Sequence, residues 1–80
     1  MITIYEVWRD KTGDSNYYQN LSDAIAAAWD IFVRDSEGIK VNTRECWSRL
    51  IDEHWIEGFC AIAEIEVKDE IFNSQNLPKF

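Results

Sequence analysis

Hydrophobic and polar residues alternate at both ends of the chain, whereas hydrophobic residues recur at helical spacing in the middle. Residues 2–9 (ITIYEVWR) are rich in β-branched and aromatic types, which suit a pleated surface and predict a strand. KTGD at residues 11–14 has turn chemistry, because glycine tolerates a positive φ and Asp can bond its own backbone. Residues 15–19 then predict a shorter returning strand with Tyr17 and Tyr18 on opposite faces, which completes a β-hairpin.

A helix is expected from Leu21 to Ser36. Asn20 suits the N-cap, and Asp23 places a carboxylate in the first turn, where the helix dipole favours negative charge. Gly38 provides the stop. Between these signals, apolar residues recur every three or four positions: Leu21, Ala24, Ile25, Ala28, Ile31 and Phe32. The small alanines would let this helix lie close to a sheet.

Residues 43–57 allow two interpretations. Asn42 begins a helix-capping pattern, and apolar residues at helical spacing follow it, which predicts a second helix ending near Gly58. The alternative is a hairpin that turns at that glycine, because Trp55 and Ile56 also suit a strand. Both interpretations stay open at this point.

A final strand is predicted over residues 59–68 (FCAIAEIEVK). Its alternation predicts a sheet that is covered on one side and wet on the other. We expect the covered face to carry Phe59, Ala61, Ala63, Ile65 and Val67, and the wet face to carry Cys60, Ile62, Glu64, Glu66 and Lys68. Pairing with residues 2–9 is expected, because these two strands are the longest and most apolar.

The order of these elements predicts a two-layer α+β domain, with a three- or four-stranded antiparallel sheet and one or two helices packed on one face. Residues 1–72 are expected to form this single domain. Residues 73–80 contain Ser, Gln, Asn and Pro and are expected to be a flexible C-terminal tail.

The charge balance indicates a class of partner. The 80 residues hold 15 Asp and Glu against 8 Lys and Arg, a formal net charge of −7, together with four tryptophans. Such a field repels nucleic acid and anionic membranes and attracts basic protein surfaces. Tryptophan is enriched at the centres of protein interfaces. The alternative is that the acidity only keeps a small domain soluble.

The cysteines and the hydropathy indicate a cytoplasmic location. Cys46 and Cys60 make no disulfide framework, no signal peptide precedes the first strand, and no apolar stretch approaches the roughly 20 residues that span a bilayer. We expect both thiols to be reduced. A homodimer remains an ordinary way for so small a core to gain area.

Catalytic and metal-binding patterns are missing from the sequence. The single histidine, His54, falls inside the second helical pattern, and no glycine-rich phosphate loop or nucleophile elbow occurs. Cys46, His54 and Cys60 lack the short ligand spacing of a zinc site. We therefore expect no enzyme activity, no metal and no cofactor.

Acidic residues on the wet face of the sheet are the first candidate binding surface. Glu64 and Glu66 lie roughly 6.6 Å apart along an extended strand. If residues 2–9 pair beside them, Glu6 and Trp8 join the same face. Asp69 and Glu70 continue the acidic run. These carboxylates could imitate the charges of a nucleic-acid backbone, or they could merely solvate the sheet.

The second helical pattern carries the second candidate surface, which comprises Asp52, Glu53, Glu57 and Trp55. Four tryptophans cannot all be core residues in a domain of this size. Trp29 and Trp47 lie on or beside apolar stripes and are expected to be buried. Trp8 and Trp55 are then the expected exposed anchors, suited to an Arg-rich surface because Arg pairs with carboxylates and stacks on indole rings.

In size, acidity and layout the chain resembles the small inhibitors that phages and mobile elements direct against CRISPR–Cas and restriction systems. The resemblance lies in the hairpin ITIYEVWRD–KTGD–SNYYQ, the capped helix NLSDAIAAAWDIF and the acidic strand FCAIAEIEVKDE. It implies an inhibitor, in the host cytoplasm if phage-encoded, that occupies a basic nucleic-acid-binding surface of a defence complex without touching nucleic acid itself. A small protein–protein adaptor or homo-oligomeric accessory protein is the alternative.

Overall fold

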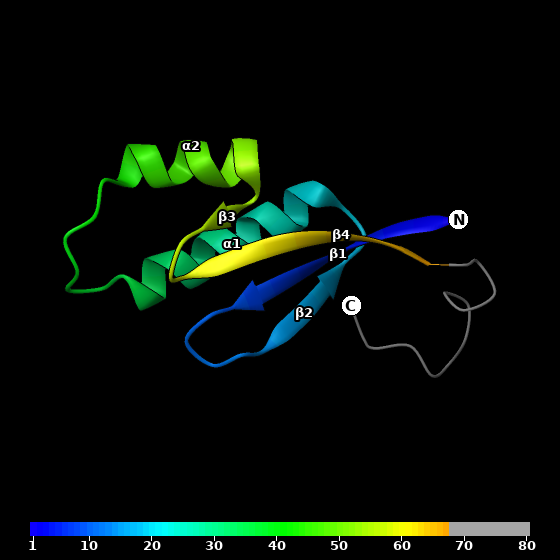
Figure 1. Ribbon diagram of the computed structural model, residues 1–80, viewed down its shortest axis with the longest axis horizontal. Helices are drawn as coiled ribbons and strands as arrows, with labels where there is room; N and C mark the ends of the chain where they lie inside the picture. Colours follow the sequence, from blue (N-terminus) through cyan, green and yellow to red (C-terminus); the bar gives the residue numbers. More distant parts are fainter. Residues whose placement is uncertain (68–80) are drawn as a thin grey trace.

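The protein is an α+β domain, as the sequence predicts, and a computed structural model describes residues 1–67 (Figure 1). Lys68, Asp69, Glu70 and the predicted tail at residues 73–80 lie outside the described residues. The elements are, in order, β1 (Ile2–Arg9), β2 (Ser15–Tyr18), α1 (Leu21–Asp35), α2 (Thr43–Glu53), β3 (Trp55–Ile56) and β4 (Cys60–Val67). No helix within residues 1–67 is long and apolar enough to cross a membrane.

The four strands form one antiparallel sheet in the order β2-β1-β4-β3. The first and last strands pair along their whole length, from Ile2 opposite Val67 to Arg9 opposite Cys60, which confirms the expected pairing. α1 runs behind this central pair, and α2 lies next to β3 (Figure 1). The hairpin between β1 and β2 turns at Gly13, whose φ of 74° suits glycine.

The segment between α2 and β4 combines the two interpretations of the sequence. α2 begins as expected, because the Asn42 side chain accepts a hydrogen bond from the Glu45 N–H at 3.1 Å. It ends at His54, which adopts the left-handed conformation with a φ of 65°. The chain then reverses, so that Trp55 and Ile56 pair with the start of β4 as a hairpin. A helix continuing through these two residues would have carried them away from the sheet.

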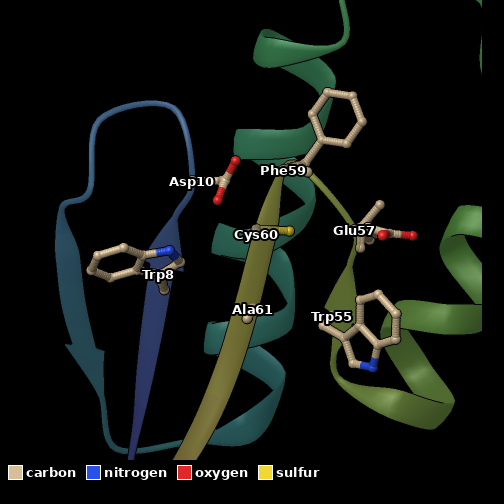
Figure 2. Close-up of a pocket in the computed structure, with 9 residues that line it drawn as sticks. Trp8, Asp10, Trp55, Glu57, Phe59, Cys60 and Ala61 are labelled. Carbon is tan, nitrogen blue, oxygen red and sulfur yellow. The ribbon is translucent and has the colours of Figure 1, made fainter.

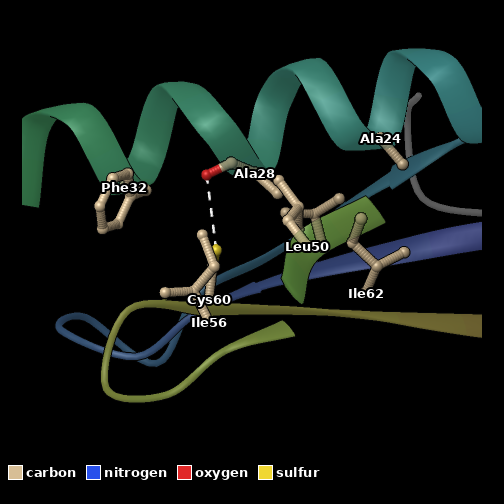
Figure 3. Packing of buried hydrophobic residues seen from close by; sticks show 8 residues of the cluster. Ala24, Ala28, Phe32, Leu50, Ile56, Cys60 and Ile62 are labelled. Atoms are coloured by element: carbon tan, nitrogen blue, oxygen red, sulfur yellow. Dashed lines mark hydrogen bonds between the residues drawn. The ribbon is translucent and has the colours of Figure 1, made fainter. Parts of the chain in front are cut away.

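The core lies between α1 and one face of the central strands (Figure 3). Cys60 and Ile62 of β4 are buried on this face, whereas Ala63 is exposed. The prediction that the helices cover the face with Phe59, Ala61, Ala63, Ile65 and Val67 is therefore wrong. The helix covers the opposite face of β4, which begins one residue later, at Cys60. The start of β4 is apolar on both faces, so its pattern alone does not decide which face the helix covers. The helix decides, because Ile62 and the opposite Val7 lie in one buried cluster with the alanines of α1.

Alanines set the distance between α1 and the sheet. Ala24 and Ala28 are fully buried, and Phe32 continues the same stripe one turn further on. The approach is close enough for the Cys60 Sγ to donate to the Ala28 carbonyl at 3.5 Å (Figure 3). Burial raises the pKa of the Cys60 thiol to about 11, so this cysteine acts as a small core residue.

α2 closes the core through Leu50, which is fully buried. Trp47 lies beside this contact on the helix and meets Trp29 of α1 edge-on, with ring centroids 5.0 Å apart. Trp29 is half-buried, but 43% of Trp47 is exposed, so the expected burial of Trp47 is wrong. Within α2 the buried residue is Leu50, and Trp47 lies at the side of this contact.

A bidentate ion pair between Arg9 and Asp35 joins the end of β1 to the end of α1. The Arg9 Nε donates to Asp35 Oδ2 at 2.9 Å, and Nη2 donates to Oδ1 at 2.5 Å. Asp35 is the last residue of α1, where the helix dipole disfavours a carboxylate, and its side chain is only 5% exposed. The hydrogen bonds from Arg9 outweigh this burial and hold the pKa of Asp35 below its ordinary value of 3.8.

Replacing Asp35 with Asn should lower the melting temperature at neutral pH, because Arg9 loses its charged partner. A carboxylate with a lowered pKa stabilises the fold fully above its ordinary pKa and loses this effect as the pH falls through its pKa in the folded protein. The difference between wild type and Asp35→Asn should therefore shrink below about pH 4, as followed by circular dichroism. Asp30→Asn is the matched control, because its ion pair with Arg34 is exposed. A difference that stays constant into acid would contradict this account.

Candidate protein-binding site

The sheet face opposite the core is the one that neither described helix covers. We call it the open face. It carries alternate residues of each strand, namely Ile2, Ile4, Glu6, Trp8, Ser15, Tyr17, Trp55, Ala61, Ala63, Ile65 and Val67. Ile4, opposite Ile65, is buried, whereas Trp8 is 43% and Trp55 37% exposed. Trp8 and Trp55 are the large exposed hydrophobic side chains among the strand residues of this face, which confirms their expected exposure.

Trp8, Ala61 and Trp55 form one row across three adjacent strands. Ala61 of β4 lies directly opposite Trp8 of β1 on one side and Trp55 of β3 on the other. Neighbouring strands are about 4.8 Å apart, so the backbones of the two tryptophans are separated by roughly 10 Å. Figure 2 shows the two indoles on either side of the small Ala61 side chain. Together with the β3–β4 turn they line a hollow of about 240 Å³.

Two carboxylates lie at one end of this row. Asp10 follows Trp8 by two residues and Glu57 follows Trp55 by two, and both line the hollow (Figure 2). β1 and β3 both run antiparallel to β4, so the two acids lie at the same end. Both are exposed, and neither has an ion-pair partner among residues 1–67. The hollow therefore combines aromatic walls with uncompensated negative charge.

Trp55 contacts a side chain of α2, and Trp8 lies near the β1–β2 turn. The guanidinium of Arg49 lies over the Trp55 ring, 5.4 Å from its centroid. Arg49 is itself held by Glu45 and Glu53, each 3.6 Å away and one helical turn from it. On the other side, the β1–β2 turn passes near Trp8, because a Cβ at Gly13 would lie 3.7 Å from its ring. The contact with Arg49 restricts the Trp55 ring before any partner arrives.

The first predicted surface is split between the two faces of the sheet. Glu6 and Trp8 lie on the open face, but Glu64 and Glu66 point to the face that carries the core. They stay exposed because the end of the β1–β4 pair extends beyond α1 (Figure 1). The prediction that all four share one face is wrong, because the register pairs Glu6 with Ala63 and not with a glutamate. Glu6 instead accepts a hydrogen bond from the Tyr17 hydroxyl at 3.2 Å, and its charge raises the pKa of Tyr17.

The second predicted surface is also divided. Asp52 and Glu53 are exposed on α2, whereas Trp55 and Glu57 join Trp8 on the open face. Sequence reasoning missed Asp10 and Ala61 as members of the site. A signal for them exists in the chain, because Trp-x-Asp at residues 8–10 and Trp-x-Glu at residues 55–57 repeat one pattern on two strands that flank β4.

The described residues assemble no metal site. Within residues 1–67 no three His, Cys, Asp or Glu side chains are grouped to hold a metal ion. His54 has a structural role that its backbone explains: its N–H donates to the Leu50 carbonyl at 3.0 Å, and its carbonyl accepts from the Ile62 N–H at 2.7 Å. This residue therefore links the end of α2 to β4.

No family model, curated protein or solved structure matches the chain.

Replacing His54 with Gly tests whether this position is a helix cap. A left-handed conformation costs a residue with a Cβ roughly 1–2 kcal/mol, which glycine avoids. Part of this gain, about 0.5–1 kcal/mol, is lost because glycine has more conformational freedom in the unfolded chain. We expect His54→Gly to raise the free energy of unfolding by about 0.5–1 kcal/mol, and His54→Val to lower it. Urea denaturation measures both. A destabilised His54→Gly protein would show instead that the imidazole makes an essential contact.

Proposed function

We propose that this protein is a non-catalytic binding domain that engages a basic surface of another protein through its open face. The observation that carries the proposal is the row of Trp8, Ala61 and Trp55, with the carboxylates of Asp10 and Glu57 at its end. Exposed tryptophans are typical anchors of protein interfaces. Carboxylates without a cation partner make such an anchor selective for positive charge.

The overall charge supports the same class of partner. A formal net charge of −7 on 80 residues repels nucleic acid and anionic membranes at long range. The same field speeds the approach of a basic protein surface and is screened by salt. A partner that normally holds nucleic acid presents a surface of this kind, because it must neutralise phosphates with Lys and Arg.

Within this class, we propose that the protein inhibits a bacterial defence complex of the CRISPR–Cas or restriction type by occupying its nucleic-acid-binding surface. The support is the acidity of the chain and its class-level resemblance to phage and mobile-element inhibitors. On this proposal the protein acts in the cytoplasm of the host bacterium. It competes with nucleic acid and does not bind it.

A second candidate function is a protein–protein adaptor or homo-oligomeric accessory protein. The observation that favours it is a set of exposed apolar side chains on the helical side of the domain: Val33, Ile39, Trp47 and Ile51. Trp47 and Ile51 lie one turn apart on α2 and would suit a second copy or an adaptor target. In this case the acidity would serve solubility alone.

Phage plating tests the proposal directly. Expression of the protein should raise the plating efficiency of a phage on bacteria whose CRISPR–Cas or restriction system targets that phage. Asp10→Lys with Glu57→Lys should abolish this protection, because both charges at the hollow are reversed. Glu64→Lys with Glu66→Lys is the matched control, since it reverses two exposed acids on the other face and should keep the protection. The wild-type complex with the captured target should weaken as salt rises from about 0.1 to 1 M, where the screening length falls from about 10 to 3 Å.

Other outcomes separate the alternatives. Loss of protection only in the Glu64 and Glu66 variant would move the site to the first predicted surface. No protection by the wild type against any system tested, together with a sedimentation mass of twice 9.4 kDa or salt-independent binding, would favour the adaptor or oligomer.

A further inference from the structure

We infer that the hollow between Trp8 and Trp55 receives an arginine side chain of the partner. This inference rests on the proposed function and specifies the chemical group that the open face recognises. The hollow measures about 240 Å³, below the roughly 300–1,000 Å³ of pockets that hold drug-sized ligands or cofactors. Its size therefore suits one inserted side chain.

The shape of the hollow follows from the small side chain at its centre. Ala61 lies between Trp8 and Trp55, whose backbones are roughly 10 Å apart. Its small side chain forms the floor of the hollow, and the two larger indoles form the walls. The apolar stem of an arginine can cover this floor, because long cationic side chains bury their methylene groups and keep the charged head accessible. A leucine or phenylalanine at position 61 would fill this space.

The charges around the hollow favour a cation. Asp10 and Glu57 both line it, and neither has an ion-pair partner among the described residues. A guanidinium suits this hollow better than an ammonium, because its planar fork offers five donors to carboxylates while its face stacks on an indole. The chain already shows this chemistry at Trp55, where Arg49 of α2 lies over the ring.

The Trp55 wall of the hollow is positioned in advance. Arg49, which forms ion pairs with Glu45 and Glu53, lies over Trp55. Binding therefore needs less additional ordering of Trp55, which lowers the entropic cost of association. A nucleobase could also stack on these rings, but its phosphates would meet the two carboxylates and the net charge of −7.

Titration with short Gly–Ser peptides that carry a central Arg-Arg, Lys-Lys or citrulline pair tests the inference. The indole N–H signals in ¹⁵N-correlated spectra report on the four tryptophans, after assignment with single Trp→Phe variants. We expect the Arg peptide to shift the signals of Trp8 and Trp55 and to leave those of Trp29 and Trp47 in place. The Lys peptide should bind about two- to fivefold more weakly, and citrulline, which lacks the charge, should show no saturable binding.

Two variants and a matched control locate the effect. Trp8→Ala should abolish the shift at Trp55, whereas Trp47→Ala should not, although Trp8 and Trp47 are both 43% exposed. Ala61→Leu keeps all charges and both indoles but fills the floor, and should also abolish binding. This second variant keeps the test decisive if Trp8→Ala fails to fold, because leucine suits a strand at least as well as alanine.

The inference would be overturned by equal binding of the Arg and Lys peptides, by shifts confined to Trp29 and Trp47, or by single-stranded DNA reproducing the shifts. Its failure can be told from failure of the proposed function. If phage protection is lost with Asp10→Lys and Glu57→Lys but survives Trp8→Ala and Ala61→Leu, the binding function stands and the arginine site falls. If the Arg peptide binds in the hollow but no protection occurs in cells, the site stands and the proposed function falls.

Discussion

The antiparallel pairing of β1 with β4 is the constraint on which the other features of this domain depend. It joins residues near the two ends of the described chain, from Ile2 opposite Val67 to Arg9 opposite Cys60. Because side chains alternate along a strand, this register assigns every residue of both strands to one face. It directs Val7, Cys60 and Ile62 toward α1, and leaves Trp8 and Ala61 on the open face. A slip of one residue would exchange the core for the candidate binding site.

The two faces of the sheet carry different kinds of residue for physical reasons. On the core face, the alanines of α1 allow a close approach, and the ion pair between Arg9 and Asp35 fastens the end of the helix to β1. On the open face, Trp8 and Trp55 are exposed beside the carboxylates of Asp10 and Glu57. Large exposed aromatic residues beside unpaired carboxylates are better explained by binding than by stability.

The elements of the fold could be predicted from the sequence because their signals are local. The bounds of β1, the start of α1 at Leu21 and the cap at Asn42 all follow from periodicity and capping chemistry. The site could be predicted only in part. Exposure of Trp8 and Trp55 was expected, but their partner residues depend on the register between strands, which no local pattern records. The apolar run at the start of β4 suits either face, and this ambiguity placed Glu64 and Glu66 beside Glu6 in the sequence prediction.

The end of α2 shows the same limit on a smaller scale. The helical spacing continues through Trp55, yet the helix ends at His54 because the chain there turns into the left-handed region and Ile56 pairs with Cys60. Tertiary pairing overrode the local periodicity. This two-residue strand is short, but it brings the second tryptophan to the open face and so completes the row.

The register across β1, β4 and β3 can be measured directly by nuclear Overhauser effects between backbone protons of the three strands. The account predicts cross-strand contacts that link Ala61 to Trp8 on one side and to Trp55 on the other. Contacts that pair Trp8 with Cys60 or Ile62 instead would place the two indoles on different faces, and would contradict the single binding site described for the open face.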